Sequence, residues 1–122
     1  REDFSLIQLV TPTTPRDRAL RICETTSGFL YYVSVTGITG ARQELPPEVV
    51  DQVGSLKAET ELPVCIGFGI SQAEQVKMLS QVADGIIVGS AIVKRVASAA
   101  EIGKAAALEN IRTFAQELVA EL

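Results

Sequence analysis

The amino-acid sequence predicts an α/β fold in which a parallel sheet is built from alternating strands and helices. Two short runs, 64–67 and 86–88, are apolar and rich in β-branched residues, with no polar alternation. Such runs are typical of strands buried on both faces, as the strands of parallel sheets are. Strand-like runs alternate with helix-like segments four times along the chain. This order predicts four βα units joined by right-handed crossovers.

The first unit combines a strand over Phe4–Val10 with a helix that ends near Thr26. The segment Thr11–Pro15 separates them, because proline restricts its own φ and biases the preceding residue away from helix. Thr14 is a favourable N-cap and Pro15 a favourable first helical residue. We therefore expect the helix to start directly after Thr14.

The second unit begins with a strand at 29–35, where aromatic and β-branched residues dominate. A glycine-hinged loop, 36–44, follows and carries threonine hydroxyls and the cation of Arg42. Loops of this length in compact α/β units are often functional. Pro46-Pro47 restarts a helix, and its apolar positions at helical spacing are expected to face the sheet: Val49, Val53 and Leu56.

The last two units are marked by their helix starts. After the third strand, Ser71 and Glu74 form an S-x-x-E pattern, which predicts a capping box. After the fourth strand, Ser90 begins a short helix that ends near Arg95. The final helix is amphipathic, and its expected apolar face comprises Leu108, Ile111, Ala115, Leu118 and Leu122.

Composition excludes several classes of function. The 122 residues are 47% hydrophobic and 5% aromatic, with no tryptophan and a net charge of −4. This suits a packed core, and the lack of a lysine and arginine cluster argues against nucleic acid as a partner. The absence of histidine excludes Ser-His-Asp and Cys-His nucleophile systems and histidine-containing metal sites. No apolar run reaches the length of a membrane span, so no membrane partner is expected.

The two cysteines, Cys23 and Cys65, fall on a predicted helix and a predicted strand. We expect free, buried thiols, which suit a cytoplasmic location, and a disulfide between them is the alternative. Two cysteines alone cannot complete a structural zinc site, so no metal is expected.

Four βα units amount to half of an eight-stranded barrel. We expect residues 1–122 to form a single domain with two apolar edge strands, at 4–10 and 85–88, that lack partners. Such edges predict a homo-oligomer that forms through them. Because the chain begins with Arg1 rather than methionine, we also expect that an upstream segment has been removed or left out.

Glycine stands at the carboxyl end of three neighbouring strands, in Thr39-Gly40, Gly67-Phe68-Gly69 and Gly89-Ser90. Glycine lets backbone N–H groups approach a ligand closely, and a following helix points its positive end at the same place. The loops after the last two strands of α/β barrels are a frequent phosphate site. We therefore expect these ends to bind a phosphate. The alternative is that the glycines serve tight turns and that Ser90 only caps a helix.

Few side chains near these strand ends could perform acid–base chemistry. Tyr31 and Tyr32 are adjacent on a strand, so they face opposite sides and one of them looks toward the site. Without histidine, general acid–base catalysis needs carboxylates at the carboxyl ends of strands. Only Glu44 lies in a loop that follows a strand. We therefore expect a small phosphorylated substrate to bind, with no catalytic residue and no cofactor supplied by this chain.

Four motifs resemble the tryptophan synthase alpha chain family, and they occur in its order and spacing over essentially the whole chain. They are Pro12-Thr13-Thr14, Tyr31-x-Val33-Ser34-x-Thr36-Gly37-Ile38-Thr39-Gly40-Ala41-Arg42, Gly67-Phe68-Gly69-Ile70-Ser71 and Val88-Gly89-Ser90-Ala91-Ile92-Val93. The last two also occur loosely in other phosphate-binding barrels. The T-G-x-T-G-A-R loop makes the resemblance specific.

The resemblance implies a TIM (β/α)8 barrel, of which this chain is a (β/α)4 half holding strands five to eight. It implies a carbon–carbon lyase of tryptophan biosynthesis. Such an enzyme cleaves indole-3-glycerol phosphate to indole and glyceraldehyde 3-phosphate, and passes indole to a pyridoxal-phosphate-bearing beta chain. The site residues that it implies are Gly40, Gly69, Gly89 and Ser90 on the phosphate, Phe68 lining the pocket, Tyr31 facing the substrate and Thr39 on the closing loop.

The chain departs from the family in one respect. The catalytic glutamate and aspartate belong to the first half of the barrel, and no residue here matches either. The resemblance therefore implies no activity for the chain alone, whether it is a truncated alpha chain or an isolated half barrel. A non-catalytic module that binds phosphate or only self-associates is the alternative. A flavodoxin-like domain that binds FMN fits less well, because Thr11–Pro15 lacks the glycines of a phosphate loop.

Overall fold

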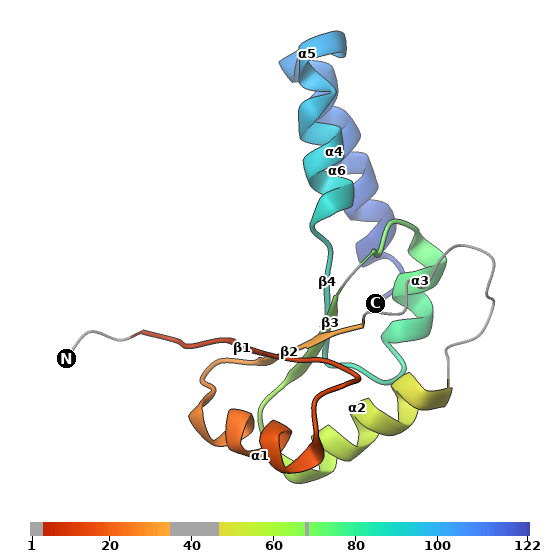
Figure 1. The fold of residues 1–122 in the computed structure, drawn as a ribbon. Coiled ribbons are helices and arrows are strands. Elements are labelled where there is room, and N and C mark those ends of the chain that lie inside the picture. Colours follow the sequence, from red (N-terminus) through yellow and green to blue (C-terminus); the bar gives the residue numbers. More distant parts are fainter. Residues whose placement is uncertain (1–3, 35–46, 68) are drawn as a thin grey trace.

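The computed structural model of the chain describes residues 4–34, 47–67 and 69–122. Strands and helices alternate through the first four units, as predicted (Figure 1). Along the chain the elements are β1 (Gln8–Val10), α1 (Arg16–Thr25), β2 (Leu30–Val33), α2 (Pro47–Glu59), β3 (Val64–Gly67), α3 (Ala73–Leu79), β4 (Gly85–Ile87), α4 (Ser90–Ala97), α5 (Ala99–Ile102) and α6 (Lys104–Val119).

The four strands form one parallel sheet in the order β1-β2-β3-β4. The register aligns Gln8 with Leu30 and Leu30 with Val64. It also aligns Cys65 with Gly85. Each strand thus pairs in parallel with the next strand along the chain, and a helix joins the two. This confirms the predicted (β/α)4 arrangement.

Strand β1 is shorter than the expected run Phe4–Val10. Its ladder to β2 begins at Gln8. The preceding backbone bonds instead to the loop before β2, where the Ser27 N–H donates to the Leu6 carbonyl at 2.9 Å. The Leu6 N–H in turn donates to the Ser27 hydroxyl at 2.7 Å. This local pairing diverts the first residues from the sheet.

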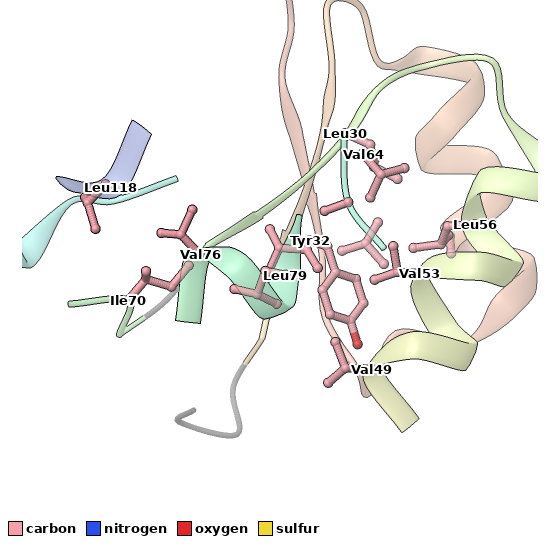
Figure 2. Packing of buried hydrophobic residues seen from close by; sticks show 14 of the residues in the cluster. Leu30, Tyr32, Val49, Val53, Leu56, Val64, Ile70, Val76, Leu79 and Leu118 are labelled. Atoms are coloured by element: carbon pink, nitrogen blue, oxygen red, sulfur yellow. The ribbon is translucent and has the colours of Figure 1, made fainter. Parts of the chain in front are cut away.

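The hydrophobic core lies on one face of the sheet, between the strands and the helices (Figure 2). Leu30 and Tyr32 of β2 are buried on this face beside Val64 and Ile66 of β3. Helix α2 buries Val49, Val53 and Leu56, as its spacing predicted. Because these positions alternate along the strands, the residues between them point to the opposite face.

The opposite face of the sheet is more open. Leu9 is 55% exposed, and Tyr31, Cys65 and Ile87 are half-buried. Two glycines there make room for neighbours. A Cβ on Gly67 would lie 2.7 Å from the Tyr31 Oη, and one on Gly85 would lie 2.7 Å from the Cys65 Sγ. In a closed barrel this face would line the interior.

Two predicted helix caps are wrong. Helix α1 is capped by Pro15 without a side-chain hydrogen bond. The Thr14 hydroxyl instead accepts the Thr11 N–H at 3.0 Å and closes the preceding turn. Helix α3 has Gln72 as its N-cap, with Gln75 completing the capping box in place of Ser71 and Glu74.

Helices α4, α5 and α6 form an arm that stands away from the sheet (Figure 1). Helix α4 runs past Arg95 to Ala97, and Gly103, with φ +84°, makes the turn into α6. Helix α6 buries a stripe that differs in part from the predicted one: Ala107, Phe114 and Leu118. Leu108 of α6 and Leu122 beyond its end are exposed. Phe114 instead faces α4, where the Arg95 Cζ lies 3.4 Å from the centroid of its ring.

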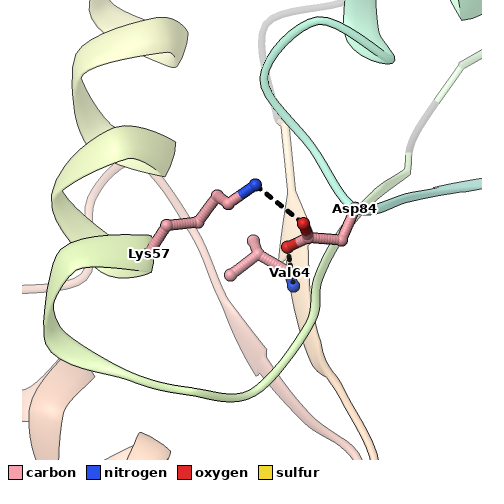
Figure 3. A network of polar contacts seen from close by, with 3 residues as sticks. All are labelled: Lys57, Val64 and Asp84. Carbon is pink, nitrogen blue, oxygen red and sulfur yellow. Dashed lines mark hydrogen bonds and ion pairs between the residues drawn. The ribbon is translucent and has the colours of Figure 1, made fainter.

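A charged contact closes the amino-terminal edge of the sheet (Figure 3). Asp84, directly before β4, accepts the Val64 N–H at 2.9 Å and a hydrogen bond from the Lys57 ammonium at 2.7 Å. The Lys57 bond holds the pKa of the Asp84 carboxyl below its usual value, helped by the Val64 N–H. The contact ties α2, β3 and β4 together.

Candidate functional site

The candidate site is built at the carboxyl ends of β3 and β4. Gly67 is in register with Ile87, so Gly69 and Gly89 each lie two residues beyond paired strand residues. Gly69 has φ +69°, a left-handed conformation that favours glycine. The parallel register therefore brings the two glycine-bearing turns to the same edge of the sheet.

The amino terminus of α4 presents backbone donors at this edge. Gly89 is its N-cap, and no side chain caps the helix. The Ile92 and Val93 N–H groups both bond to the Gly89 carbonyl, at 2.9 and 3.1 Å. The N–H groups of Ser90 and Ala91 precede them and have no partner within the helix. These donors and the helix dipole favour an anion.

At the neighbouring helix α3, a glutamine side chain binds the N–H groups that come just before the helix. The Gln75 Oε1 accepts the Ser71 N–H at 2.8 Å and the Gln72 N–H at 3.0 Å. Gln75 is 3% exposed, so this cap is built into the packed structure. Sequence reasoning missed Gln75, although Gln72-x-x-Gln75 is itself a capping pattern.

Space for a ligand is available above Gly89. A Cβ built on Gly89 would meet no described atom within 4 Å, and the same holds at Gly69. Ser90 is exposed beside it. Glycine at 89 is therefore not demanded by packing against the described residues, which leaves room for a group that approaches the backbone.

The two tyrosines of β2 face opposite sides, as predicted. Tyr31 lies on the open face with its ring over Gly67. Tyr32 is buried, and its hydroxyl donates to the Gln52 side-chain carbonyl. Burial raises the pKa of Tyr32 to about 12. Tyr31 is thus the tyrosine on the face that leads toward the candidate site.

Ser34 follows β2 at the same edge of the sheet. Its N–H donates to the Gly67 carbonyl at 3.2 Å. Its side chain is fully buried, and among the described residues its hydroxyl has no hydrogen-bond partner. The backbone bond fixes the end of β2 against the end of β3, next to the glycine turn.

Of the predicted site residues, Gly69, Gly89 and Ser90 follow the paired carboxyl ends of β3 and β4, and the ring of Tyr31 lies over Gly67 of β3. Thr39, Gly40 and Phe68 lie outside the described residues, as does the loop carboxylate of Glu44.

Within 4–34, 47–67 and 69–122, no cluster of three or more histidine, cysteine, aspartate or glutamate side chains could hold a metal ion. No helix in these ranges is both long and apolar enough to cross a membrane.

Both cysteines are free, as predicted. Cys23 is buried in α1, and Cys65 is half-buried beside Gly85. Burial raises the pKa of both thiols. Neither side chain therefore has the lowered pKa of a reactive thiolate.

The parallel sheet, the alternating helices and the strand-end turns define a protein of the (β/α) barrel class. A sequence model of the family described as tryptophan synthase alpha chain matches residues 1–122. The chain belongs to the tryptophan synthase alpha chain family.

Curated relatives agree with this assignment. The tryptophan synthase alpha chain of Rhodopirellula baltica is 61% identical over 114 residues, which cover 93% of this chain and 41% of the relative. The alpha chain of Carboxydothermus hydrogenoformans is 47% identical over 117 residues, which cover 94% of this chain and 44% of the relative. The chain therefore spans about two-fifths of the length of these relatives.

Solved structures match the fold. A chain of the tryptophan synthase α2β2 complex from Pyrococcus furiosus superposes with a TM-score of 0.78 at 35% identity. The match covers 95% of this chain and 46% of that chain. The four βα units are thus a partial barrel, as the sequence predicted.

Proposed function

We propose that this chain supplies the phosphate-binding half of a carbon–carbon lyase site for indole-3-glycerol phosphate. The products would be indole and glyceraldehyde 3-phosphate. Residues 1–122 act in this proposal as one domain, the carboxyl-terminal half of a TIM barrel. The observation that carries it is the amino terminus of α4, which no side chain caps and which follows β4 at the same sheet edge as the turn at Gly69.

Phosphate binding would use backbone groups. The N–H groups of Ser90 and Ala91 point out of the helix start, and the Ser90 hydroxyl adds a donor. Gly69 and Gly89 carry no side chain that would fill the approach. Gly40 would complete the phosphate contacts, while Phe68 would line the pocket and Thr39 would lie on the closing loop, as in the family pattern.

Bond cleavage would need groups that these residues lack. Breaking the bond between the indole ring and the glycerol chain requires a proton on the ring carbon and a base on a glycerol hydroxyl. General acid–base groups contribute roughly 10²–10⁴-fold each. Asp84, the carboxylate closest in sequence to β4, lies at the opposite edge of the sheet and is held by Lys57. We therefore propose that the chain binds the phosphate but does not cleave the substrate by itself.

The proposal extends to a protein partner. The Pyrococcus furiosus relative is described within an α2β2 complex. By the same family membership, a tryptophan synthase beta chain would receive the indole, in the cytoplasm, once the barrel is complete.

A second function is favoured by one observation. Of the described side-chain carboxylates, none lies in the turns that follow β3 and β4: they lie on helices, just after α6, or at the amino-terminal edge of the sheet. A module that binds phosphate or self-associates without catalysis would have this arrangement. The lyase half and the non-catalytic module would both bind phosphate. Only the lyase half would take part in producing indole.

The phosphate site is tested by amide chemical shifts during titration with inorganic phosphate and with glyceraldehyde 3-phosphate. We expect saturable shifts at Gly69, Gly89, Ser90 and Ala91. Gly89→Val should weaken binding roughly tenfold or more, which is about 1.4 kcal/mol. The described surroundings leave space for the new side chain, so the variant should keep its fold.

The matched control is Gly54→Ala, a change in α2 that also meets no described atom. It should leave phosphate binding unchanged. Shifts that spare residues 89–91 at saturating phosphate would reject the site, and so would equal affinity of Gly89→Val and the parent.

A further inference from the structure

We propose that a cavity between α1 and α2 binds a small, uncharged ring compound that carries a hydroxyl group. The two helices are neighbours on the helix-covered face of the sheet (Figure 1). The cavity between them has a volume of about 240 Å³. The described residues that line it all fall within 10–59, so its walls belong to the first two βα units. The proposal is independent of the phosphate site.

The floor of the cavity is apolar. Val10 and Ala19 are buried at its base, and Leu56 lines it from α2. The ring of Tyr32, which extends from β2 alongside α2, completes this surface (Figure 2). An apolar cavity of about 150 Å³ is large enough for benzene, and drug-sized ligands occupy pockets of about 300 Å³ or more. The volume therefore suits one substituted ring.

Polar groups meet where the cavity borders the turn after β1. The buried Tyr32 hydroxyl donates to the Gln52 side-chain carbonyl. The other end of the same amide, the Gln52 Nε2, donates to the Pro12 carbonyl at 3.5 Å, where about 2.9 Å is usual. Pro12 and Gln52 both line the cavity. A ligand hydroxyl beside them would accept a hydrogen bond from the Gln52 amide and donate one to the Pro12 carbonyl.

Tyr32 fixes the orientation of this amide. Because its hydroxyl donates to the Gln52 carbonyl oxygen, the amide nitrogen is the end that faces Pro12. Burial raises the pKa of Tyr32 to about 12, so the hydroxyl keeps its proton at neutral pH. The cavity thus presents one fixed donor and one weakly bonded acceptor, which is the pair that a hydroxyl group satisfies.

The charges at the cavity cancel. Arg16 of α1 and Glu59 of α2 line it and form an ion pair with each other. The other described lining residues are uncharged. A charged ligand would lose hydration without meeting an unpaired opposite charge. The lining therefore favours an uncharged compound.

The first test is a titration with phenol, followed by amide chemical shifts. Toluene serves as the compound of equal size without a hydroxyl group, and benzoate as the charged one. With phenol we expect saturable shifts at Thr11, Gln52 and Leu56, which line the cavity. Toluene should bind roughly three- to tenfold more weakly, since it lacks the hydrogen bonds. Benzoate should leave these amides unmoved.

Three results of the titration would overturn the proposal. Phenol that leaves the amides of the cavity unmoved would show that the cavity takes no such ring. Equal affinities for phenol and toluene would remove the role of the hydroxyl group. Benzoate that binds as tightly as phenol would show that charge does not matter at this place.

The cavity itself is tested by filling it. Ser55 is exposed and lines the cavity, so Ser55→Phe should place a ring at its mouth without disturbing the fold. We expect the affinity for phenol to fall at least tenfold. The matched control is Ala58→Phe, at an exposed position of α2 that does not line the cavity, and it should bind phenol like the parent. Unchanged binding by Ser55→Phe would overturn the proposal.

The role of the amide is tested by Gln52→Leu, which keeps the bulk of the side chain and removes its donor. We expect the affinity for phenol to fall to that of toluene, with the affinity for toluene unchanged. A variant that still prefers phenol over toluene would overturn the assigned contact. If Gln52→Leu does not fold, the phenol-to-toluene ratio of the parent and the loss in Ser55→Phe decide the proposal.

Discussion

Gly67 is required by the ring of Tyr31 rather than by its own backbone. A Cβ at position 67 would lie 2.7 Å from the Tyr31 Oη, and 2.8 Å from the Tyr31 Cε2 and the Ile87 Cβ. The Ile87 Cβ is close to the backbone and cannot move away easily. The sequence suggested that Gly67 lets the backbone approach a ligand. The structure shows that Gly67 also makes room for the Tyr31 ring and for Ile87.

We predict that Gly67→Ala lowers the free energy of unfolding by about 1–3 kcal/mol, the usual cost of overpacking. Tyr31→Ala should recover part of this loss in the double variant, because it removes two of the three close contacts. Denaturant unfolding of the four proteins in the cycle measures the coupling. Strictly additive effects would mean that the ring does not constrain position 67.

Gly54→Ala serves as the contrast. Position 54 lies within α2, and a Cβ there meets no described atom within 4 Å. Alanine is favoured over glycine in a helix interior by about 1 kcal/mol. We expect a gain in stability of up to that amount in the same unfolding measurement, and a loss would contradict the packing described for α2.

Asp84 makes stability depend on pH. Its pKa is lowered in the folded chain, first by the Lys57 hydrogen bond and next by the Val64 N–H. A lowered folded pKa adds stability above the unfolded value, near pH 4, and that stability is lost as pH falls through the folded pKa. The contact in Figure 3 should therefore weaken in acid.

We predict that Asp84→Asn is less stable than the parent at neutral pH and that the difference shrinks below about pH 4. Thermal unfolding across pH 3–7 measures this, with the exposed Asp51→Asn as control. A difference that stays constant over this range would show that the Asp84 charge does not stabilise the fold.

At the scale of single elements, the start of α3 shows which part of the fold could be predicted. The strand, the glycine turn and the helix after Gly69 all follow from local sequence, and all are present. The identity of the capping residue does not follow from local sequence, since Ser71 and Gln72 each begin a plausible capping pattern. Burial decides between them, because the Gln75 side chain is packed where its oxygen reaches both N–H groups.

We predict that Gln75→Ala lowers the free energy of unfolding by about 1–2 kcal/mol, because the Ser71 and Gln72 N–H groups lose their acceptor. Ser71→Ala should change it by less than about 0.5 kcal/mol. Denaturant unfolding compares the two variants. A larger cost for Ser71→Ala would restore the cap expected from the S-x-x-E pattern.

Helix α6 shows where periodicity is insufficient. Its apolar residues support more than one stripe, and the sequence does not reveal which neighbour the helix meets. In the structure Phe114 meets Arg95 of α4, and Glu121, just beyond α6, pairs with Lys77 of α3 at 3.8 Å. Leu118 lies on both the predicted and the observed stripes, whereas Leu108 and Leu122 remain exposed.

For the whole molecule, the four-unit parallel sheet and the glycine turns after β3 and β4 could be predicted, because each rests on local patterns repeated along the chain. The site as a whole could be predicted only in part. The register of the sheet puts Gly69, Gly89 and Ser90 after strand ends at one edge, and it puts Tyr31 on the open face near Gly67. None of the motifs that this chain carries supplies an acid or a base, so the proposed function needs groups from elsewhere in a barrel.

The most direct test of this account is indole release from indole-3-glycerol phosphate, measured for the chain alone and after mixing with a separately produced first half of a related alpha chain. We predict no measurable release by the chain alone, because binding without acid–base groups does not raise the chemical rate. The mixture should release indole, and Gly89→Val should reduce that release. Steady release by the chain alone, lost in Glu44→Gln, would contradict the account, since a loop carboxylate would then perform chemistry assigned to the other half of the barrel.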